Sequence, residues 1–587
     1  MKRMTRREIL RRLAGISVLG AAGTAIGATG MRGASAPNVR PLASHAFTSS
    51  TAGRSRMTTT TVLSAATSGD HANHAASPSA VSTAPSGSTS QPTAGPTETT
   101  APTSSASTTP ATTTGPAPTS SAPPVAAVGT SELSGPLGPT LVPAGAVAKI
   151  VGDVELGGDL VIEGLLTSVD TFTLRGNGFQ IEVRNGGQLD LRGVPKSGWV
   201  RGASPSGWQA SDRILTAPTE PGRYALSDFH TGAPGAVNLA DGRTIVAEQF
   251  NLTRSITIDN VSRIMFHMGA GRQILKHIAV TNSGIAGELA FYPIHFHLNG
   301  NTTRGSMVEG VVVENGRFHA FVPHASHGVT FLDCVAFNTM GEAYWWDPPL
   351  GSDDASNDTY DTVWQHCLAA FVVRAEGSEI KRTSAFRLGR GVGNRCVDCT
   401  AIAVQDGPQT SGFHWPEKSA AVWDFRSCVA HNNVSNGIFV WQNNEQNEHH
   451  IDGFIAYRCG KAGIEHGAYA NRYIYRDAVL TDTTVGLIEH ALPRKDASLV
   501  FETIVSNDRL LVEGHNSGSA FPVYYRSCHF SGVTYAELGN SGSSHNVYQD
   551  CGLTPAHFDL TGIKPNSVID INEAGVLVHQ WAGGSWK

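Results

Sequence analysis

The residues with the clearest chemical potential lie in one short stretch, Tyr292-Pro293-Ile294-His295-Phe296-His297. Successive side chains of a β-strand point to opposite faces, so His295 and His297 share one face while Ile294 and Phe296 share the other. If the apolar pair faces a core, both imidazoles lie on the outer surface. There they can bind one cation or act as an acid and a base. The alternative is a pair of solvated histidines beside a core strand.

Two further residues follow at intervals that suggest a repeating fold. His324 follows His297, and Asp347 follows His324, after similar lengths of chain. If each interval is about one turn of the repeat, His297, His324 and Asp347 stack on a single outer sheet. Two or three histidines with a carboxylate form a ligand set for a divalent transition metal that keeps an open coordination position.

Other side chains are candidates for binding a sugar. Trp345, Trp346, Trp415 and Trp441 would stack on sugar rings if they are exposed, but tryptophan is also a common core residue. Arg317 lies between His297 and His324 in the chain, where it is placed to reach the same groove and bind the carboxylate of a uronic acid.

The elements that must position these residues are short β-strands. From about Gly129 onward, apolar runs alternate with Gly, Asn and Asp, and we find no amphipathic helix of three turns. Segments with Cys, an apolar residue and Ala recur, with cysteines at positions 334, 367, 399, 428 and 459. Such a near-constant period predicts a solenoid of stacked β-coils, best a right-handed parallel β-helix, with a β-propeller as the competing architecture.

The eight cysteines have more than one interpretation. An even count in an exported protein favours disulfides, and Cys396-Val397-Asp398-Cys399 resembles a metal or redox motif. One cysteine per coil in the same frame instead predicts thiols that point inward and stack as small apolar groups. We expect this interior ladder.

The N-terminal region predicts export followed by a tether. Thr5-Arg6-Arg7-Glu8-Ile9-Leu10-Arg11 resembles a bacterial twin-arginine signal, and the weakly apolar stretch after it leads to small-residue cleavage patterns, so residues 1–46 are expected to be an export signal. Residues 47–128 are almost entirely Ser, Thr, Ala, Pro and Gly, a composition that cannot bury a core and predicts a disordered linker. The protein is therefore expected to be secreted or held at the cell surface.

The distribution of net charge along the chain limits the kinds of macromolecule that it is expected to bind. Residues 1–56 carry ten Lys or Arg and one acid, a net charge of +9, so the remaining residues carry −6 − 9 = −15. Binding of nucleic acid needs a basic surface, so the acidic balance beyond residue 56 argues against a nucleic-acid partner. The same argument weighs against acidic polysaccharides unless a local basic groove overrides it. Beyond the N-terminus there is no apolar run long enough to span a membrane, so the mature form is expected to have no membrane span, and a monomer is assumed.

The stretches YPIHFH, RFHAFVPHASHGV and CVAFNTMGEAYWWD resemble the family of the vertebrate cell-migration-inducing hyaluronan-binding protein and its transmembrane hyaluronidase relative. Glycines between Gly145 and Gly193 resemble that family's eight-glycine domain. The resemblance implies an eight-glycine-like β domain at 129–260 and a right-handed parallel β-helix at 261–587. It also implies action on, or binding of, hyaluronan or a related extracellular polysaccharide. His295 and His297 match the paired histidines, and His324 matches the histidine one coil on.

Two functional hypotheses follow. In the first, an outer groove holds a divalent metal ion on His295, His297 and His324, and the protein is a polysaccharide hydrolase or lyase. Asp347 would match an acidic residue of the family, whereas Glu342 stands where the family has histidine; either carboxylate would be a ligand or a general base. In the second hypothesis the protein is a non-catalytic glycan-binding or adhesion module on a Thr/Pro-rich stalk.

Overall fold

The computed structural model describes residues 126–127, 131–202 and, with short gaps, the rest of the chain to 587. The gaps are 203–204, 206, 347–357, 376–381, 406, 408, 416–421, 442–446, 468–471, 491, 493–496, 514–520, 532–534 and 539–542. The chain divides into two units, Met1–Thr113 and Thr114–Lys587, and every described residue belongs to the second. The predicted export signal lies outside the described residues, and so does the predicted linker except Ala126–Ala127, which already form a strand.

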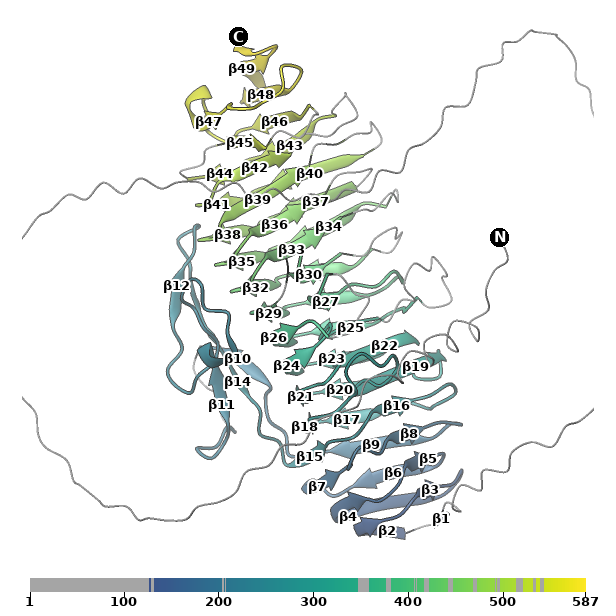
Figure 1. The fold of residues 1–587 in the computed structure, drawn as a ribbon. Coiled ribbons are helices and arrows are strands. Elements are labelled where there is room, and N and C mark those ends of the chain that lie inside the picture. The colour runs from purple at the N-terminus through teal and green to yellow at the C-terminus, as the bar shows by residue number, and fades with distance from the viewer. Residues whose placement is uncertain are drawn as a thin grey trace, which may run out of the picture. The chain divides into compact units, whose positions relative to one another are not determined.

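The described chain winds as a right-handed parallel β-helix whose turns each contribute strands to three walls (Figure 1). Wall A carries the candidate histidines. Its strands are β1 (Ala126–Ala127), β3 (Thr140–Val142), β5 (Leu160–Ile162), β8 (Ile181–Val183), β16 (Ile264–Phe266), β19 (Ile294–Gly300), β22 (Phe321–Ser326), β27 (Ser384–Arg387), β30 (Ser411–His414), β33 (Asn436–Val440), β36 (Ala462–His466), β39 (Val485–His490), β42 (Leu510–Glu513), β45 (Tyr535–Leu538) and β47 (Phe558–Asp559). Parallel bridges from Phe321 to Tyr344 and from Tyr344 to Phe386 connect β22 with β27, so wall A is continuous.

Wall B follows wall A in each turn. Its strands are β6 (Leu165–Ser168), β9 (Gln188–Arg192), β17 (Ile274–Lys276), β20 (Met307–Glu309), β23 (Thr330–Leu332), β25 (Val363–Gln365), β28 (Arg395–Val397), β31 (Asp424–Arg426), β34 (His449–Asp452), β37 (Arg472–Arg476), β40 (Ser498–Glu502), β43 (Val523–Arg526), β46 (His545–Gln549) and β48 (Val568–Glu573). Each strand pairs in parallel with its equivalent one turn later, for example β23 with β25.

Wall C closes each turn. It contains β2 (Ser131–Leu137), β4 (Val147–Leu156), β7 (Phe172–Arg175), β15 (Ile256–Asp259), β18 (Ile278–Thr281), β21 (Val312–Glu314), β24 (Val335–Met340), β26 (Leu368–Val373), β29 (Thr400–Ile402), β32 (Val429–His431), β35 (Ile455–Tyr457), β38 (Val479–Thr481), β41 (Val505–Ser506) and β44 (His529–Phe530). Because β7 pairs directly with β15, the coils before residue 260 continue into those after it. The structure confirms the all-β parallel β-helix.

Short polar residues make the corners between walls possible. Asn282, Asn315 and Asn338 occupy equivalent corners with φ near +50°, a left-handed conformation that Asn tolerates better than most residues. Their side chains form a ladder: Asn338 Nδ2 donates to Asn315 Oδ1 at 2.7 Å, and Asn315 Nδ2 donates to Asn282 Oδ1 at 3.2 Å. Each amide thereby supports the next turn, which keeps the coils in register.

The cysteines confirm one expectation and correct another. All eight are free and buried, as expected for interior thiols. Cys334, Cys367, Cys399 and Cys428 occupy one column at the corner between walls B and C, where the carbonyl of each accepts a hydrogen bond from the next turn. Cys459 is not in this column, because the next turn places Phe454 there. The similar spacing of Cys459 from Cys428 is therefore a coincidence.

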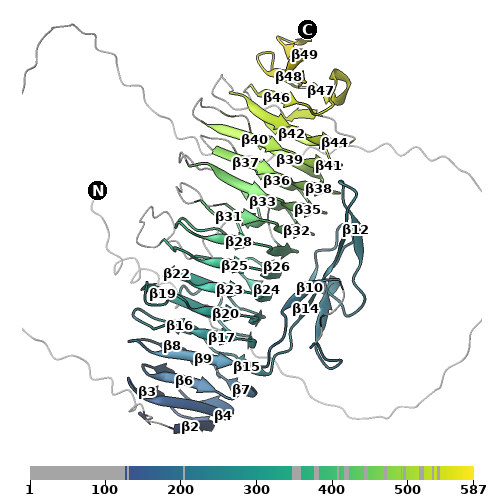
Figure 2. The same cartoon turned by 180° about the vertical axis from the view of Figure 1, so that it is seen from behind.

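Residues 197–252 form an insertion that runs beside the coils of wall C (Figure 2). It contains β10 (Trp199–Arg201), β11 (Ile214–Thr216), the 3-10 turn η1 (Leu226–Asp228), β12 (Ala236–Asn238), β13 (Thr244–Val246) and β14 (Glu248–Asn251), all antiparallel where they pair. A buried Glu248 bonds His431 Nε2 at 2.9 Å and Arg201 Nε at 2.9 Å, and thereby fastens the insertion to wall C.

The C-terminal end of the β-helix carries a small antiparallel element. The 3-10 turn η3 (Pro555–His557) precedes it, β49 (Val576–Ala582) folds back on β48, and β50 (Ser585–Trp586) folds back on β49. Among the described residues, no helix is long and apolar enough to cross a membrane.

Candidate functional site

The strand parity predicted for the central motif is confirmed. Ile294 and Phe296 in β19 are buried in the main core of the β-helix, whereas His295 and His297 lie on the outer face of wall A. His295 is nevertheless buried, and His297 is half-buried. The imidazoles therefore stand on the outer side of the wall without being freely solvated.

The three histidines predicted as metal ligands come together. Strands β19 and β22 pair in parallel with His297 opposite His324, and the Nδ1 atoms of these two rings lie 3.2 Å apart. One nitrogen from each of His295, His297 and His324 lies within 4.8 Å of the other two. Tetrahedral zinc with Zn–N bonds of 2.0–2.1 Å needs ligand nitrogens ~3.4 Å apart, so small ring rotations would bring all three to one ion.

Hydrogen bonding and burial prepare His295 to donate a lone pair. Its Nδ1–H donates to the carbonyl oxygen of Ala290 at 3.3 Å, which leaves Nε2 as the ring nitrogen that carries the lone pair. Burial, followed by the nearby His297 and His324 rings, holds the pKa of His295 well below its usual range. A neutral imidazole whose tautomer is fixed by a backbone carbonyl is the form that binds a metal ion.

Glu342 lies on the same outer face, one coil beyond His324, and it is completely buried. Its Oε2 atom lies 3.1 Å from His319 Nδ1, and its Oε1 atom lies 3.5 Å from Arg387 Nη1. The His319 ring also packs against Trp345, with ring centroids 4.0 Å apart. His319 Nδ1 accepts a hydrogen bond from the backbone N–H of Glu342 at 2.9 Å, and neither carboxylate oxygen of Glu342 has a hydrogen-bond partner among the described residues. Glu342 is thus a buried carboxyl group near an imidazole and a guanidinium, with both oxygens left to meet a ligand or a proton.

The other predicted residues are scattered. Asp347 lies outside the described residues. Trp345 and Trp346 are buried on the outer side of wall A, where Trp345 packs with Tyr292 and Trp346 lies under Arg390. Arg317 is exposed at the turn before β22. Trp441 is half-buried on the outer face of wall A, just after β33, and stacks on Phe439.

Trp415 corrects the sequence-based expectation. It belongs to the main core, where it packs against Phe425 and Tyr473 and its Nε1–H donates to His449 Nδ1 at 3.4 Å. The reason is strand parity: Phe413 points inward, His414 outward and Trp415 inward again. A residue inside the β-helix cannot serve as a platform for a sugar.

Sequence reasoning missed several polar residues on the outer face. Arg387 follows the inward Phe386, and His414 follows the inward Phe413 in the next coil, where the two outward residues are paired partners. His319 lies shortly before the inward Phe321. The signal was present in the sequence as a polar residue close to each inward aromatic, but the coil lengths needed to align these positions were unknown.

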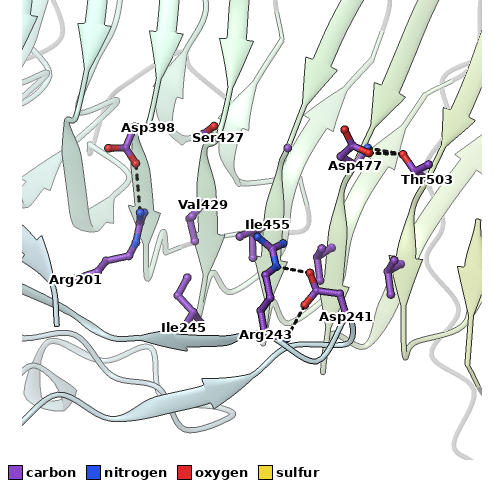
Figure 3. Close-up of a pocket in the computed structure, with 13 residues that line it drawn as sticks. Arg201, Asp241, Arg243, Ile245, Asp398, Ser427, Val429, Ile455, Asp477 and Thr503 are labelled. Carbon is purple, nitrogen blue, oxygen red and sulfur yellow. Dashed lines mark hydrogen bonds and ion pairs between the residues drawn. The ribbon is translucent and has the colours of Figure 1, made fainter.

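A pocket of about 620 Å³ lies elsewhere, between the insertion and wall C (Figure 3). Valine and isoleucine side chains of wall C form its floor. Four of its five charged residues form ion pairs, Arg243 with Asp241 and Arg201 with Asp398, and the fifth, Asp477, accepts a hydrogen bond from the Thr503 hydroxyl. Most charges of the pocket are therefore already paired within the protein, and the pocket shares no residue with the histidine cluster.

Comparisons with known proteins give one family match and several distant structural likenesses. A family model described as the CEMIP β-helix matches residues 260–348, which include all three clustered histidines. A search of curated proteins finds no significant match. Among solved structures, the catalytic domain of a GH87 α-1,3-glucanase in complex with tetrasaccharides aligns at 10% identity and a TM-score of 0.35, covering 70% of this chain and 64% of the other. The chain thus spans less than two thirds of that protein. The A-module of the Azotobacter vinelandii mannuronan C-5 epimerase AlgE4 aligns at 12% identity and a TM-score of 0.25, covering 74% and 87%.

Proposed function

We propose that the protein is an exported enzyme that cleaves an extracellular polysaccharide with the help of a divalent metal ion, and the match of residues 260–348 to the family model described as the CEMIP β-helix supports this proposal. Hyaluronan and related glycans are the first substrates to test. The observation that carries the proposal is the convergence of His295, His297 and His324 within 4.8 Å on the outer face of wall A. Three imidazoles at that separation suit one metal ion.

The residues on this outer face would have different roles. A divalent metal ion held by the three imidazoles supplies a Lewis acid for a glycan oxygen or lowers the pKa of a water molecule. The backbone carbonyl of Ala290 keeps the His295 ring oriented. The buried carboxyl group of Glu342, whose oxygens have no hydrogen-bond partner among the described residues, would give or take a proton on this outer face, as either a leaving oxygen or a sugar C–H group would require.

A second candidate function is glycan binding without turnover. It is favoured by Trp441, whose half-buried indole lies on the same outer face with the guanidinium carbon of Arg382 5.4 Å from its ring. An aromatic ring and a cation together suit a sugar with no need for chemistry. If the protein only binds glycan, replacing His295, His297 or His324 would leave its affinity for glycan unchanged.

The test is a depolymerisation screen of the full chain against hyaluronan, chondroitin, pectate and neutral glycans. Chain length is followed by size-exclusion chromatography, and unsaturated uronate by ultraviolet absorbance, with and without a chelator. The His297→Ala variant is compared with His529→Ala, which removes an exposed histidine from wall C. We expect chain shortening that is lost with the chelator and with His297→Ala but is kept by His529→Ala.

The possible results separate the hypotheses. Metal-dependent shortening with new absorbance identifies a lyase, and shortening without it identifies a hydrolase. Intact chains from a folded, metal-loaded sample that still binds glycan would contradict the enzyme and leave the binding module. Shortening that survives both chelation and His297→Ala would contradict the role given to the histidines.

A further inference from the structure

A second polar cluster lies on the outer face of wall A, beyond the region matched by the family model. Arg387 in β27 is paired with His414 in β30, and His414 is paired with Phe439 in β33, so the three side chains stack on successive coils. Neither His414 nor Phe439 belongs to the main core. Along the helix axis this column continues the outer face that carries His295 and Glu342, at about 4.8 Å per coil.

The floor of this cluster holds polar atoms whose hydrogen bonds are not satisfied by the protein. His414 is 1% exposed, and neither of its ring nitrogens has a hydrogen-bond partner. Beside it, Ser411 and Asn436 are also buried, and neither the hydroxyl nor the side-chain amide has a partner. Leaving a buried polar group unpaired costs about 1–3 kcal/mol, so a row of such groups is unusual in a folded protein.

This second row also faces outward. In the same column, Ala462 lies two coils after Ser411 and Val485 lies three, and both pack with Ile488 in a small cluster that is separate from the main core. A glycine supplies the complementary evidence: a Cβ added to Gly412, next to Ser411, would meet Ala401 and Ala430 inside the helix. The unsatisfied atoms of Ser411 and Asn436 are therefore on the side of the wall that a glycan would approach.

Arg387 forms the accessible rim above this floor. Its side chain is 23% exposed, and both of its described contacts, to Glu342 Oε1 at 3.5 Å and to the carbonyl oxygen of Arg382 at 3.4 Å, involve Nη1. A guanidinium has five N–H donors in a planar fork, so Nε and Nη2 remain for a planar acceptor. Burial, then the charges of Arg387 and Arg382, hold the pKa of His414 well below its usual range. The two guanidinium groups therefore make the local potential positive.

We propose that Arg387 and His414, with Asn436 beside them, form an anion-recognising subsite that binds the carboxylate of an acidic sugar and makes the enzyme prefer acidic over neutral glycans. This rests on the proposed function, because it places the acidic unit in the same groove as the metal site. The carboxylate accepts two hydrogen bonds from the guanidinium fork, while the neutral imidazole and the amide donate from the floor. A locally basic groove of this kind allows a chain that carries −15 beyond residue 56 to bind a polyanion.

The experiment measures binding of two matched ligands to the full chain by calorimetry. One is a hyaluronan octasaccharide, and the other is the same oligosaccharide with its carboxyl groups reduced to alcohols. Arg387→Gln should lower the affinity for the acidic ligand by about tenfold or more, since a charge-assisted pair is lost, and should leave the reduced ligand almost unchanged. Arg387→Lys should recover only part of the affinity, because an ammonium lacks the fork.

Two controls keep the outcome clear. Arg175→Gln removes an exposed arginine from β7 in wall C, away from the outer face of wall A, and should change neither affinity. His414→Leu removes a side chain that has no hydrogen bond to lose, so the melting temperature should stay the same or rise while the affinity for the acidic ligand falls several-fold. His414→Leu also tests the subsite independently of Glu342, because Arg387 lies close to the Glu342 carboxylate and Arg387→Gln could disturb that buried group.

The proposal fails if the wild type binds both ligands equally, if Arg387→Gln weakens both equally, or if Arg175→Gln causes the selective loss. It also fails if no acidic oligosaccharide binds at all. These results are independent of the proposed cleavage: a chain that cuts a neutral glycan in a metal-dependent way would keep its function and lose this subsite. Conversely, His297→Ala should abolish cleavage while the preference for the carboxylate persists.

Discussion

Histidines occur on the outside and on the inside of this β-helix, and the two groups differ in what their nitrogens contact. Outside wall A, the nitrogens of His295, His297 and His324 converge on one another. Inside, His466 Nδ1 lies 2.9 Å from the hydroxyl of Tyr475, and His449 accepts from the indole of Trp415. The inner rings have partners that a folded core supplies, whereas the outer rings face each other.

Lowered basicity does not distinguish these groups. Burial is the largest cause of the lowered pKa for His295, for His449, whose pKa is about 4, and for His466, whose pKa is about 3. A perturbed titration therefore reports only that a ring is out of water. What marks the outer group as a site is geometry, since among the residues that the structure describes it is the group whose possible ligand nitrogens lie close enough together for one cation.

The largest expected effect is on metal binding and catalytic turnover, which should depend on the outer histidines and not on the interior ones. His324→Ala removes one of the three converging nitrogens, so we expect bound metal and turnover to fall by at least ~100-fold, given that even the outer partners of metal ligands contribute about 10–100-fold. The matched interior change, His449→Gln, should keep both. Metal content of the purified protein and the rate of chain shortening measure this directly. If His324→Ala and His449→Gln lost bound metal and turnover to a similar extent, the outer histidines would not differ in function from the interior ones.

Stability at low pH should depend on the interior group. The folded-state pKa of His466, about 3, lies below its value of about 6.5 in an unfolded chain. Between these values the unfolded state binds more protons, so stability falls as the pH falls from about 6.5, on the order of 1.4 kcal/mol per pH unit for this residue. His466→Gln cannot titrate, and urea unfolding at about pH 7 and pH 5 should show a smaller loss for it. An equal loss in wild type and variant would contradict the assignment.

Glu489 extends the comparison to carboxylates. It is completely buried inside the helix, where the Tyr525 hydroxyl donates to its Oε2 atom at 2.5 Å and Asn546 Nδ2 donates to the same atom at 2.7 Å. Glu489→Ala leaves these donors without their acceptor, and we expect a loss of roughly 2–3 kcal/mol in the free energy of unfolding. Glu489→Gln keeps an acceptor and should lose less. Denaturant midpoints measure both, and metal binding should not change in either.

Strand parity and repetition made much of this architecture predictable. The alternation in residues 294–297 was enough to place His295 and His297 outside, and the interval from His297 to His324 matched one coil. The same alternation could not be applied to Trp415, because the sequence did not show where its strand begins or which neighbouring residue points inward. The inward residues Tyr344 and Phe386 are also one coil apart, yet the chain between them is much longer than the chain between Phe321 and Tyr344. No fixed period could therefore align the coils beyond residue 344.

The insertion was also beyond prediction, for a different physical reason. Its hold on wall C comes from contacts between distant residues, such as Arg213 with Glu314 and Glu248 with His431, which leave no periodic trace in the sequence. Likewise, the polar row of Ser411 and Asn436 is recognisable only when coils are stacked. Repetition predicts the walls, but the lengths of the turns decide which side chains become neighbours.

The smallest expected effect concerns the cysteines, which test whether the interior is held by packing alone. Because all eight thiols are free and buried, a reducing agent should leave the melting temperature unchanged, whereas a protein with disulfides would melt earlier. Cys399→Ala should cost roughly 1 kcal/mol, the value of a small apolar group removed from a core. The effect is small because the thiol contributes contacts and no cross-link. A fall in melting temperature on reduction would show that the interior column is bonded and that it differs from the outer face in covalent structure as well as in polarity.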